Sequence, residues 1–123
     1  MTKINFIHIC ENAFSSKESG NLNLIGIFDG INSKNFPALH PLFFLVANIV
    51  LEENKEHDVS ITVKNTGDSS DSFTTSTFKV SGDKAQIIYK FINYNFKSAG
   101  NYEFCINIDQ EQLEPTTIKL KQI

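Results

Sequence analysis

Apolar and polar residues alternate most clearly near the C-terminus of the chain. After Gly100, large apolar residues occupy every second position, namely Tyr102, Phe104, Ile106 and Ile108. The alternation predicts a β-strand with one face in a core and the other in water. A glycine shortly before a tyrosine at the start of such a strand is typical of β-sandwiches, in which the tyrosine hydroxyl bonds to backbone upstream.

Seven further segments have strand character and are separated by turn signals: 4–12, 22–30, 41–51, 57–64, 73–80, 85–96 and 116–123. Segment 41–51 is apolar at almost every position, which favours a central strand buried on both faces over a buried helix. Segment 73–80 alternates only weakly, through serine and threonine, and this predicts a solvent-facing edge strand. Residues 65–72 are rich in Gly, Asp and Ser, which predicts a flexible loop.

These segments predict an all-β protein. We expect a single-domain, Ig-like antiparallel β-sandwich of about eight strands that spans residues 1–123. A chain of 123 residues is long enough to bury a core without a metal or a disulfide. No low-complexity tract or linker divides it.

Charge and composition narrow the classes of partner. The chain has a formal net charge of −3 and all 11 of its basic residues are lysines. Arginine is the residue that most often recognises phosphates and base edges, so we expect no nucleic-acid partner. The longest apolar run, 42–51, is too short for a membrane helix, and no uniform apolar leader begins the chain. We therefore expect a cytoplasmic protein without membrane association.

Two sequence patterns resemble an uncharacterised family of small bacterial proteins. The first is the hairpin pattern G-x-L-x-L-x-G-I-F-D from Gly20 to Asp29, which is followed by Phe36-Pro37. The second is the pattern G-x-Y-x-F-x-I from Gly100 to Ile106, while residues 52–83 match no pattern of the family. The resemblance implies a β-sandwich fold and no assigned activity.

The histidines and cysteines give little sign of chemistry. His8, His40 and His57 have no partner at metal-ligand spacing, so we expect no metal and no cofactor. His8 and Cys10 would share one face of the first strand, and a thiol enzyme that uses this pair is one alternative. A half-buried histidine beside an inert cysteine is the simpler interpretation. The alternation places Cys105 on the outward face of its strand, and we expect both cysteines to be free thiols.

Carboxylates gather in the expected loops, at Glu52, Glu53, Glu56, Asp58, Asp68, Asp71 and Asp83. Sandwich loops can bind calcium through such oxygens, which is a second alternative, but their spacing is not that of an EF-hand. Solvated acidic loops are the simpler interpretation. The chain has no phosphate-binding glycine loop and no G-x-S-x-G motif.

The aromatic residues supply the candidate partner surface. By parity, Tyr89 and Phe91 share one face of their strand and Tyr94 and Phe96 the other, unless a bulge intervenes near Asn93. One pair could then form an exposed patch that binds a protein or, less favourably without tryptophan, a sugar ring. The segment between Phe73 and Phe78 has no proline and no charge, so it is a weakly protected edge that could form a weak homodimer.

We therefore expect a non-enzymatic binding module, a protein-binding accessory protein of a bacterium, mobile element or phage. Its candidate partner surface is Tyr94, Phe96, Phe73 and Phe78. The alternatives are a structural or assembly subunit that forms homo-oligomers, a carbohydrate- or calcium-binding sandwich, and the thiol enzyme.

Overall fold

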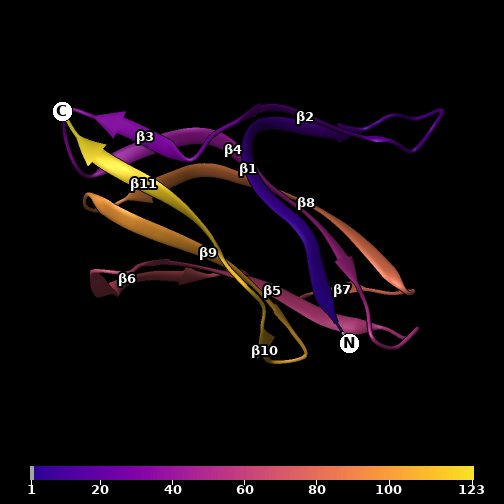
Figure 1. The fold of residues 1–123 in the computed structure, drawn as a ribbon. Helices are drawn as coiled ribbons and strands as arrows, with labels where there is room; N and C mark the ends of the chain where they lie inside the picture. The colour runs from indigo at the N-terminus through magenta and orange to yellow at the C-terminus, as the bar shows by residue number, and fades with distance from the viewer. Residues whose placement is uncertain (1) are drawn as a thin grey trace.

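The computed structural model describes residues 2–123, which fold into two facing β-sheets (Figure 1). The smaller sheet has the strand order β2-β1-β4-β8, and the larger sheet has the order β3-β11-β9-β5-β6, with β10 paired to β9 and β7 paired to β5. The strands are β1 (Lys3–Ser15), β2 (Leu22–Ile27), β3 (Gly30–Ser33), β4 (Ala38–Val50), β5 (His57–Asn65), β6 (Asp68–Thr74), β7 (Phe78–Val80), β8 (Lys84–Phe96), β9 (Gly100–Ile108), β10 (Glu111–Gln112) and β11 (Thr116–Gln122). The expected all-β sandwich is confirmed. No part of residues 2–123 forms a helix that could span a bilayer.

The segment expected as one strand at 22–30 is two strands in different sheets. Strand β2 pairs with β1 in the smaller sheet, and β3 pairs with β11 in the larger sheet. The chain crosses between the sheets at Phe28 and Asp29, where the Phe28 ring packs against the core. The β3–β11 pair is parallel, so the expectation of a fully antiparallel sandwich is wrong at this one place.

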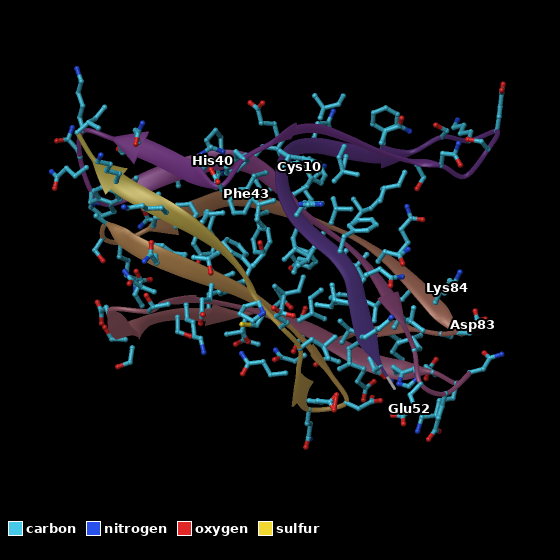
Figure 2. All side chains as sticks on the ribbon, viewed as in Figure 1. Cys10, His40, Phe43, Glu52, Asp83 and Lys84 are labelled. Carbon is cyan, nitrogen blue, oxygen red and sulfur yellow. The ribbon has the colours of Figure 1, made fainter. Side chains whose placement is uncertain are left out.

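Strand β4 is the centre of the smaller sheet and is buried on both faces, as its apolar sequence predicts. Phe43 and Leu45 face the larger sheet and belong to the main core. Phe44 and Val46 face the opposite way, into a second cluster with Cys10. Side chains from both sheets fill the space between them (Figure 2).

Tyr102 anchors the corner at which β9 begins, as the sequence predicts. Its side chain is fully buried, and its hydroxyl lies 2.8 Å from the carbonyl oxygen of Ser98, four residues upstream. Gly100 has φ +142° at this corner, and a Cβ atom there would lie 2.9 Å from Oδ1 of Asn65. Only glycine fits this position without displacing the buried Asn65 side chain.

The expected edge strand at 73–80 is interrupted. Strand β6 begins within the expected loop, at Asp68, and ends at Thr74, and β7 begins at Phe78. Between them Thr75 turns into the molecule: its N–H donates to the carbonyl of Ile61, and its hydroxyl accepts from the N–H of the same residue. The Thr75 hydroxyl thus takes the place of a backbone carbonyl as the acceptor for Ile61, and the regular β5–β6 ladder ends at Thr74.

Candidate binding groove

An open groove lies along one side of the sandwich. Strand β8 forms an edge of the smaller sheet, paired with β4 in one register over its whole length. On the same side the larger sheet ends in β6 and β7. The space between β8 and β6 has a volume of about 440 Å³. We call it the side groove, and its lining is Asp71, Ser72, Phe73, Tyr89–Asn95 and Lys97.

Asn93 decides which aromatic side chains of β8 point inward. Its φ is +51°, a left-handed conformation that breaks the strict alternation of the strand. Phe91 is buried and Ile92 is exposed, yet Tyr94 also packs against the main core. The parity switch therefore turns both predicted aromatic pairs towards the larger sheet.

Phe96 is not part of an exposed surface, so this residue of the candidate partner surface is wrong. It is fully buried, and its ring centroid lies 5.0 Å from that of Tyr102. The sequence parity assigned Phe96 to the opposite face from Phe91, and the Asn93 conformation reverses that assignment.

The other three residues of the candidate partner surface lie on the open side of the sandwich. The Phe73 ring meets Tyr94 edge-on at 6.0 Å between centroids, and the Phe78 ring stacks on Tyr89 at 6.0 Å. The tertiary structure therefore brings together residues from β6, β7 and β8 that are distant in the sequence. Burial, and then the charge of nearby Asp71, raise the pKa of the Tyr94 hydroxyl well above its usual value.

Phe73 faces inward but is 45% exposed. Phe73 is paired with Val63 on β5, which is a core residue, so the Phe73 side chain lies on the face of the larger sheet that is turned towards the smaller sheet. The smaller sheet ends at β8, and Tyr94 is the aromatic residue that reaches the Phe73 ring. An aromatic ring in an inward-facing position therefore remains half accessible to solvent.

Asp71 supplies a buried carboxylate at one end of the side groove. It is only 3% exposed, and the hydroxyl of Tyr102 donates to its Oδ2 atom at 2.5 Å. Burial, followed by this hydrogen bond to Asp71, raises the pKa of Tyr102. The sequence predicts a flexible loop at Asp71, whereas the structure has it in β6. The period of two through Asp71, Phe73 and Thr75 was the signal of an inward-facing row that could have identified it.

Lysines border the groove. Lys90 and Lys97 line it, and within residues 2–123 neither forms an ion pair, whereas Lys55, Lys64 and Lys79 do. Lys90 is opposite Phe44 in the β4–β8 ladder, so its side chain lies on the outer face of the smaller sheet. The groove thus has an aromatic interior and a positively charged border.

The two cysteines are both buried. Cys10 is fully buried beside Phe44, and this burial raises the pKa of its thiol. The His8 ring stacks on Phe6 at 5.6 Å between centroids. A nucleophilic cysteine requires a lowered thiol pKa, so this environment is the opposite of the one that a thiol enzyme needs.

Cys105 is 1% exposed although it alternates with inward-facing Phe104 and Ile106. Cys105 therefore points away from the main core, as the alternation predicts, but it is not exposed. The β9–β10 hairpin brings the Gln112 side chain to the thiol and covers it. Burial raises the pKa of this thiol as well.

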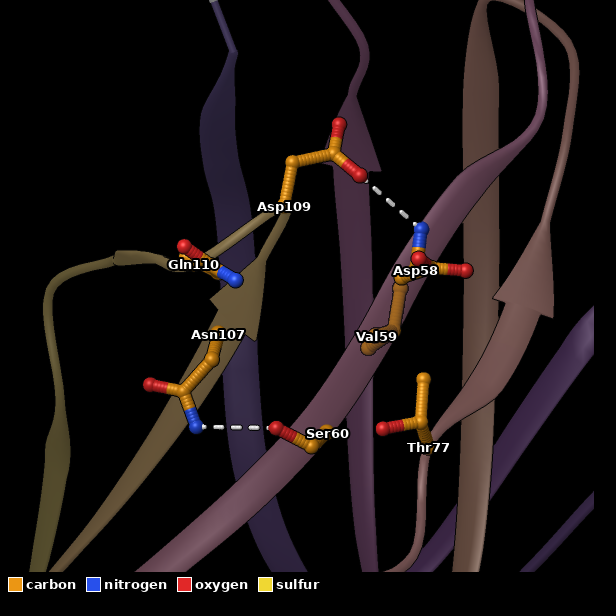
Figure 3. A pocket seen from close by; sticks show the side chains of 7 residues that line it. All are labelled: Asp58, Val59, Ser60, Thr77, Asn107, Asp109 and Gln110. Atoms are coloured by element: carbon orange, nitrogen blue, oxygen red, sulfur yellow. Dashed lines mark hydrogen bonds between the residues drawn. The ribbon is translucent and has the colours of Figure 1, made fainter.

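A polar pocket lies over β5 and the end of β9, and two hydrogen bonds join residues that line it (Figure 3). Asn107 donates to the hydroxyls of Ser60 and Thr62, and the Asp109 carboxylate accepts from the backbone N–H of Asp58. These bonds join β9, and the turn that follows it, to the adjacent strand β5.

His57, the first residue of β5, is 4% exposed. One ring nitrogen lies 2.9 Å from the carbonyl oxygen of Glu53, and the other lies 2.6 Å from Oδ2 of Asp109. These two hydrogen bonds raise the pKa of His57 above its usual 6.5. Since both nitrogens face acceptors, both donate when the ring is protonated, and neither is free to accept a proton from a substrate. His40, in contrast, has its pKa lowered by burial, and its ring lies 5.4 Å from that of Phe43.

The acidic residues considered for calcium are dispersed, and several have partners within the chain. Asp58 pairs with Lys79, Asp68 accepts from Ser70, and Asp71 accepts from Tyr102. In the described part of the chain, no three His, Cys, Asp or Glu side chains converge on a point that could hold a metal ion.

The two sheets form a small β-sandwich with an open groove between the edges of β8 and β6. The chain belongs to a family of unknown function, DUF6941, whose model matches residues 5–121. The expectation of an uncharacterised family is confirmed at that level. A comparison with curated proteins gives no significant match.

A solved structure shares the fold. It is that of the Pseudomonas fluorescens alkylpurine DNA glycosylase AlkC bound to DNA containing an abasic site analog. The TM-score is 0.60 at 10% sequence identity, over 98% of this chain and 30% of that chain. This chain therefore spans less than a third of the length of the glycosylase, and the likeness concerns the fold alone.

Proposed function

We propose that this protein is a non-enzymatic binding module that holds a protein partner in the side groove. The observation that carries the proposal is Phe73, an inward-facing aromatic ring that is 45% exposed beside the edge strand β8. Aromatic residues in a concave site are the usual anchors of protein interfaces. Half-buried Tyr94, whose ring contacts that of Phe73, extends the same apolar surface.

The environments of the candidate catalytic groups support a non-enzymatic role. Both thiols have raised pKa values through burial, which disfavours a thiolate nucleophile. Both ring nitrogens of His57 are engaged with Asp109 and Glu53. Two free, buried thiols also fit a reducing compartment, which supports a cytoplasmic accessory protein of a bacterium, mobile element or phage.

A DNA-binding role by analogy with the glycosylase is a weaker proposal. The chain has no arginine and a net charge of −3, and a surface that follows phosphates needs clustered positive charge. A homo-oligomeric assembly subunit is the second candidate. It is supported by the exposed pair Leu42 and Ile92, which lie opposite each other on the outer face of the smaller sheet.

The test uses a library of randomised linear peptides displayed on phage and selected on the immobilised protein. Selected peptides should bind the Phe73→Ser variant about tenfold more weakly, because a central aromatic anchor is lost. Phe14→Ser is the matched control, since Phe14 is 47% exposed on β1 and does not line the groove. Its binding should stay within about twofold.

Two results would contradict the proposal. One is a library that yields no enriched binder after repeated rounds. The other is a set of binders that lose as much affinity for Phe14→Ser as for Phe73→Ser. Light scattering on the same samples distinguishes the assembly candidate, which requires a dimer or larger species without any peptide.

A further inference from the structure

The two sheets end at different places on the open side of the sandwich. In the larger sheet, β6 continues the layer beyond β5, and Phe73 on β6 points towards the smaller sheet. The smaller sheet stops at β8, so Phe73 meets the side of Tyr94 and solvent instead of a packed strand. One more strand beside β8 would lie over Phe73.

We propose that the side groove binds its partner by strand addition: an extended segment with alternating acidic and apolar residues pairs with the free edge of β8. The inference rests on the proposed function and adds the binding mode and the chemistry of the partner. Strand addition to an exposed sheet edge is a recurrent mode of peptide recognition, in which backbone bonds supply affinity and side-chain pockets supply specificity.

The geometry of β8 supports this mode. Its ladder with β4 keeps one register from Lys84 to Phe96, including the residues on both sides of Asn93. Its backbone groups on the groove side have no strand partner within residues 2–123. The edge of β6, by comparison, is short and ends where Thr75 turns inward, so it offers a poorer template.

The two faces of β8 specify the side chains of the added segment. On the inner face, Tyr94 and Phe73 offer an apolar surface for the inward-facing residues of the segment. On the outer face, Lys90 carries a positive charge without an ion-pair partner among the described residues. Lys97 adds another at the end of the groove. A segment that places apolar residues inward and acidic residues outward complements both faces.

The same charges disfavour a second copy of this chain as the occupant. Strand β8 contains Lys84 and Lys90 and no acidic residue. Pairing of β8 with another β8 would therefore bring only positive charges together, which is unfavourable between adjacent strands. An acidic segment of a different protein is the better complement.

The test uses a synthetic peptide of about nine residues, in which glutamate alternates with valine and phenylalanine. Nuclear magnetic resonance titration of the full chain gives the affinity and the amide hydrogen exchange of β8. Binding should slow exchange of the β8 amides that face the groove. A matched peptide that is N-methylated at alternate residues cannot donate those backbone bonds and should bind at least about tenfold more weakly.

Charge variants test the outer face. The double variant Lys90→Glu and Lys97→Glu should weaken binding about fivefold, whereas Lys121→Glu on β11 should leave it within twofold. All three side chains are exposed, so the fold should be retained. A peptide with lysine in place of glutamate should bind the wild-type chain more weakly and the double variant more strongly.

Each contrary result has a distinct meaning. Equal binding of the N-methylated peptide, at a site that still depends on Phe73, would overturn strand addition and leave the proposed function intact. Equal binding of the lysine peptide would overturn the acidic partner. Slowed exchange of β8 that depends on protein concentration without peptide would replace the partner with a second copy. Failure of both this peptide and the displayed library to bind at the groove would overturn the inference together with the proposed function.

Discussion

Removal of a single oxygen atom, by Tyr102→Phe, tests the physical basis of the corner between β8 and β9. The Tyr102 hydroxyl is buried and lies 2.5 Å from Oδ2 of Asp71 and 2.8 Å from the carbonyl oxygen of Ser98. Phenylalanine keeps the ring and its contact with Phe96. The substitution therefore removes the hydrogen bonds and leaves the apolar packing almost unchanged.

The expected cost follows from the partners that are left behind. A hydrogen bond to a charged group contributes about 1.5–3 kcal/mol, and a buried acceptor without a donor retains its desolvation penalty. Asp71 is 3% exposed, so water cannot replace the lost donor without a local rearrangement. We expect a loss of about 2 kcal/mol in the free energy of unfolding. For a chain of this size this corresponds to a fall of roughly 8 °C in Tm.

Urea unfolding followed by far-ultraviolet circular dichroism measures this loss, since the chain contains no tryptophan. Tyr89→Phe is the matched control, because Tyr89 is half-buried and its hydroxyl makes no hydrogen bond within residues 2–123. A double-mutant cycle with Asp71→Asn should give a coupling free energy of about 1 kcal/mol. If Tyr102→Phe costs less than about 0.5 kcal/mol, or no more than Tyr89→Phe, the hydroxyl does not stabilise the corner as we argue.

Two further predictions concern the turns and the buried histidine. Gly100→Ala should lower the free energy of unfolding by about 2–3 kcal/mol, because φ is +142° and the new Cβ would lie 2.9 Å from Asn65. Gly20→Ala is the control: Gly20 has φ +72° and no atom lies within 4 Å of the new Cβ, so the substitution adds backbone strain alone. It should cost less in the same urea titration. His57 has a raised pKa in the folded state, so its contribution to stability is complete below the usual pKa of 6.5 and is lost as the pH rises through the folded value. Measured from pH 6 upwards, the free energy of unfolding should decline for the wild-type chain and decline less for His57→Gln, and identical slopes would show that the His57 bonds to Glu53 and Asp109 do not hold the proton.

The local pattern of apolar and polar residues was sufficient to predict burial wherever a strand's own residues determine which of its faces is buried. The uninterrupted apolar run of β4 predicts burial on both faces, and Phe43 and Phe44 are buried on opposite sides of the sheet. The alternation after Gly100 predicts β9 and the buried corner tyrosine. These predictions hold because a pleated strand turns successive side chains to opposite faces, whatever its neighbours are.

The lining of the side groove could not be predicted from the local sequence pattern, because it depends on contacts between distant segments and on one backbone conformation. One left-handed residue, Asn93, turned Tyr94 towards the groove and Phe96 into the core, and the sequence left such a bulge open. The burial of Asp71 required Tyr102, which lies 31 residues further along the chain. Thr75 ended the expected edge strand because its bonds to Ile61 were available only after β5 was in place.

The amino-acid sequence by itself determined that the chain forms alternating strands with a shared apolar core and no strongly basic surface. The tertiary structure alone decided which strand lies at an edge. Strand order follows from the pairing of segments far apart in the chain, such as β4 with β8, and the local period is the same for a central strand and an edge strand. For this reason the half-exposed Phe73 beside the free edge of β8 becomes visible only when the two sheets face each other.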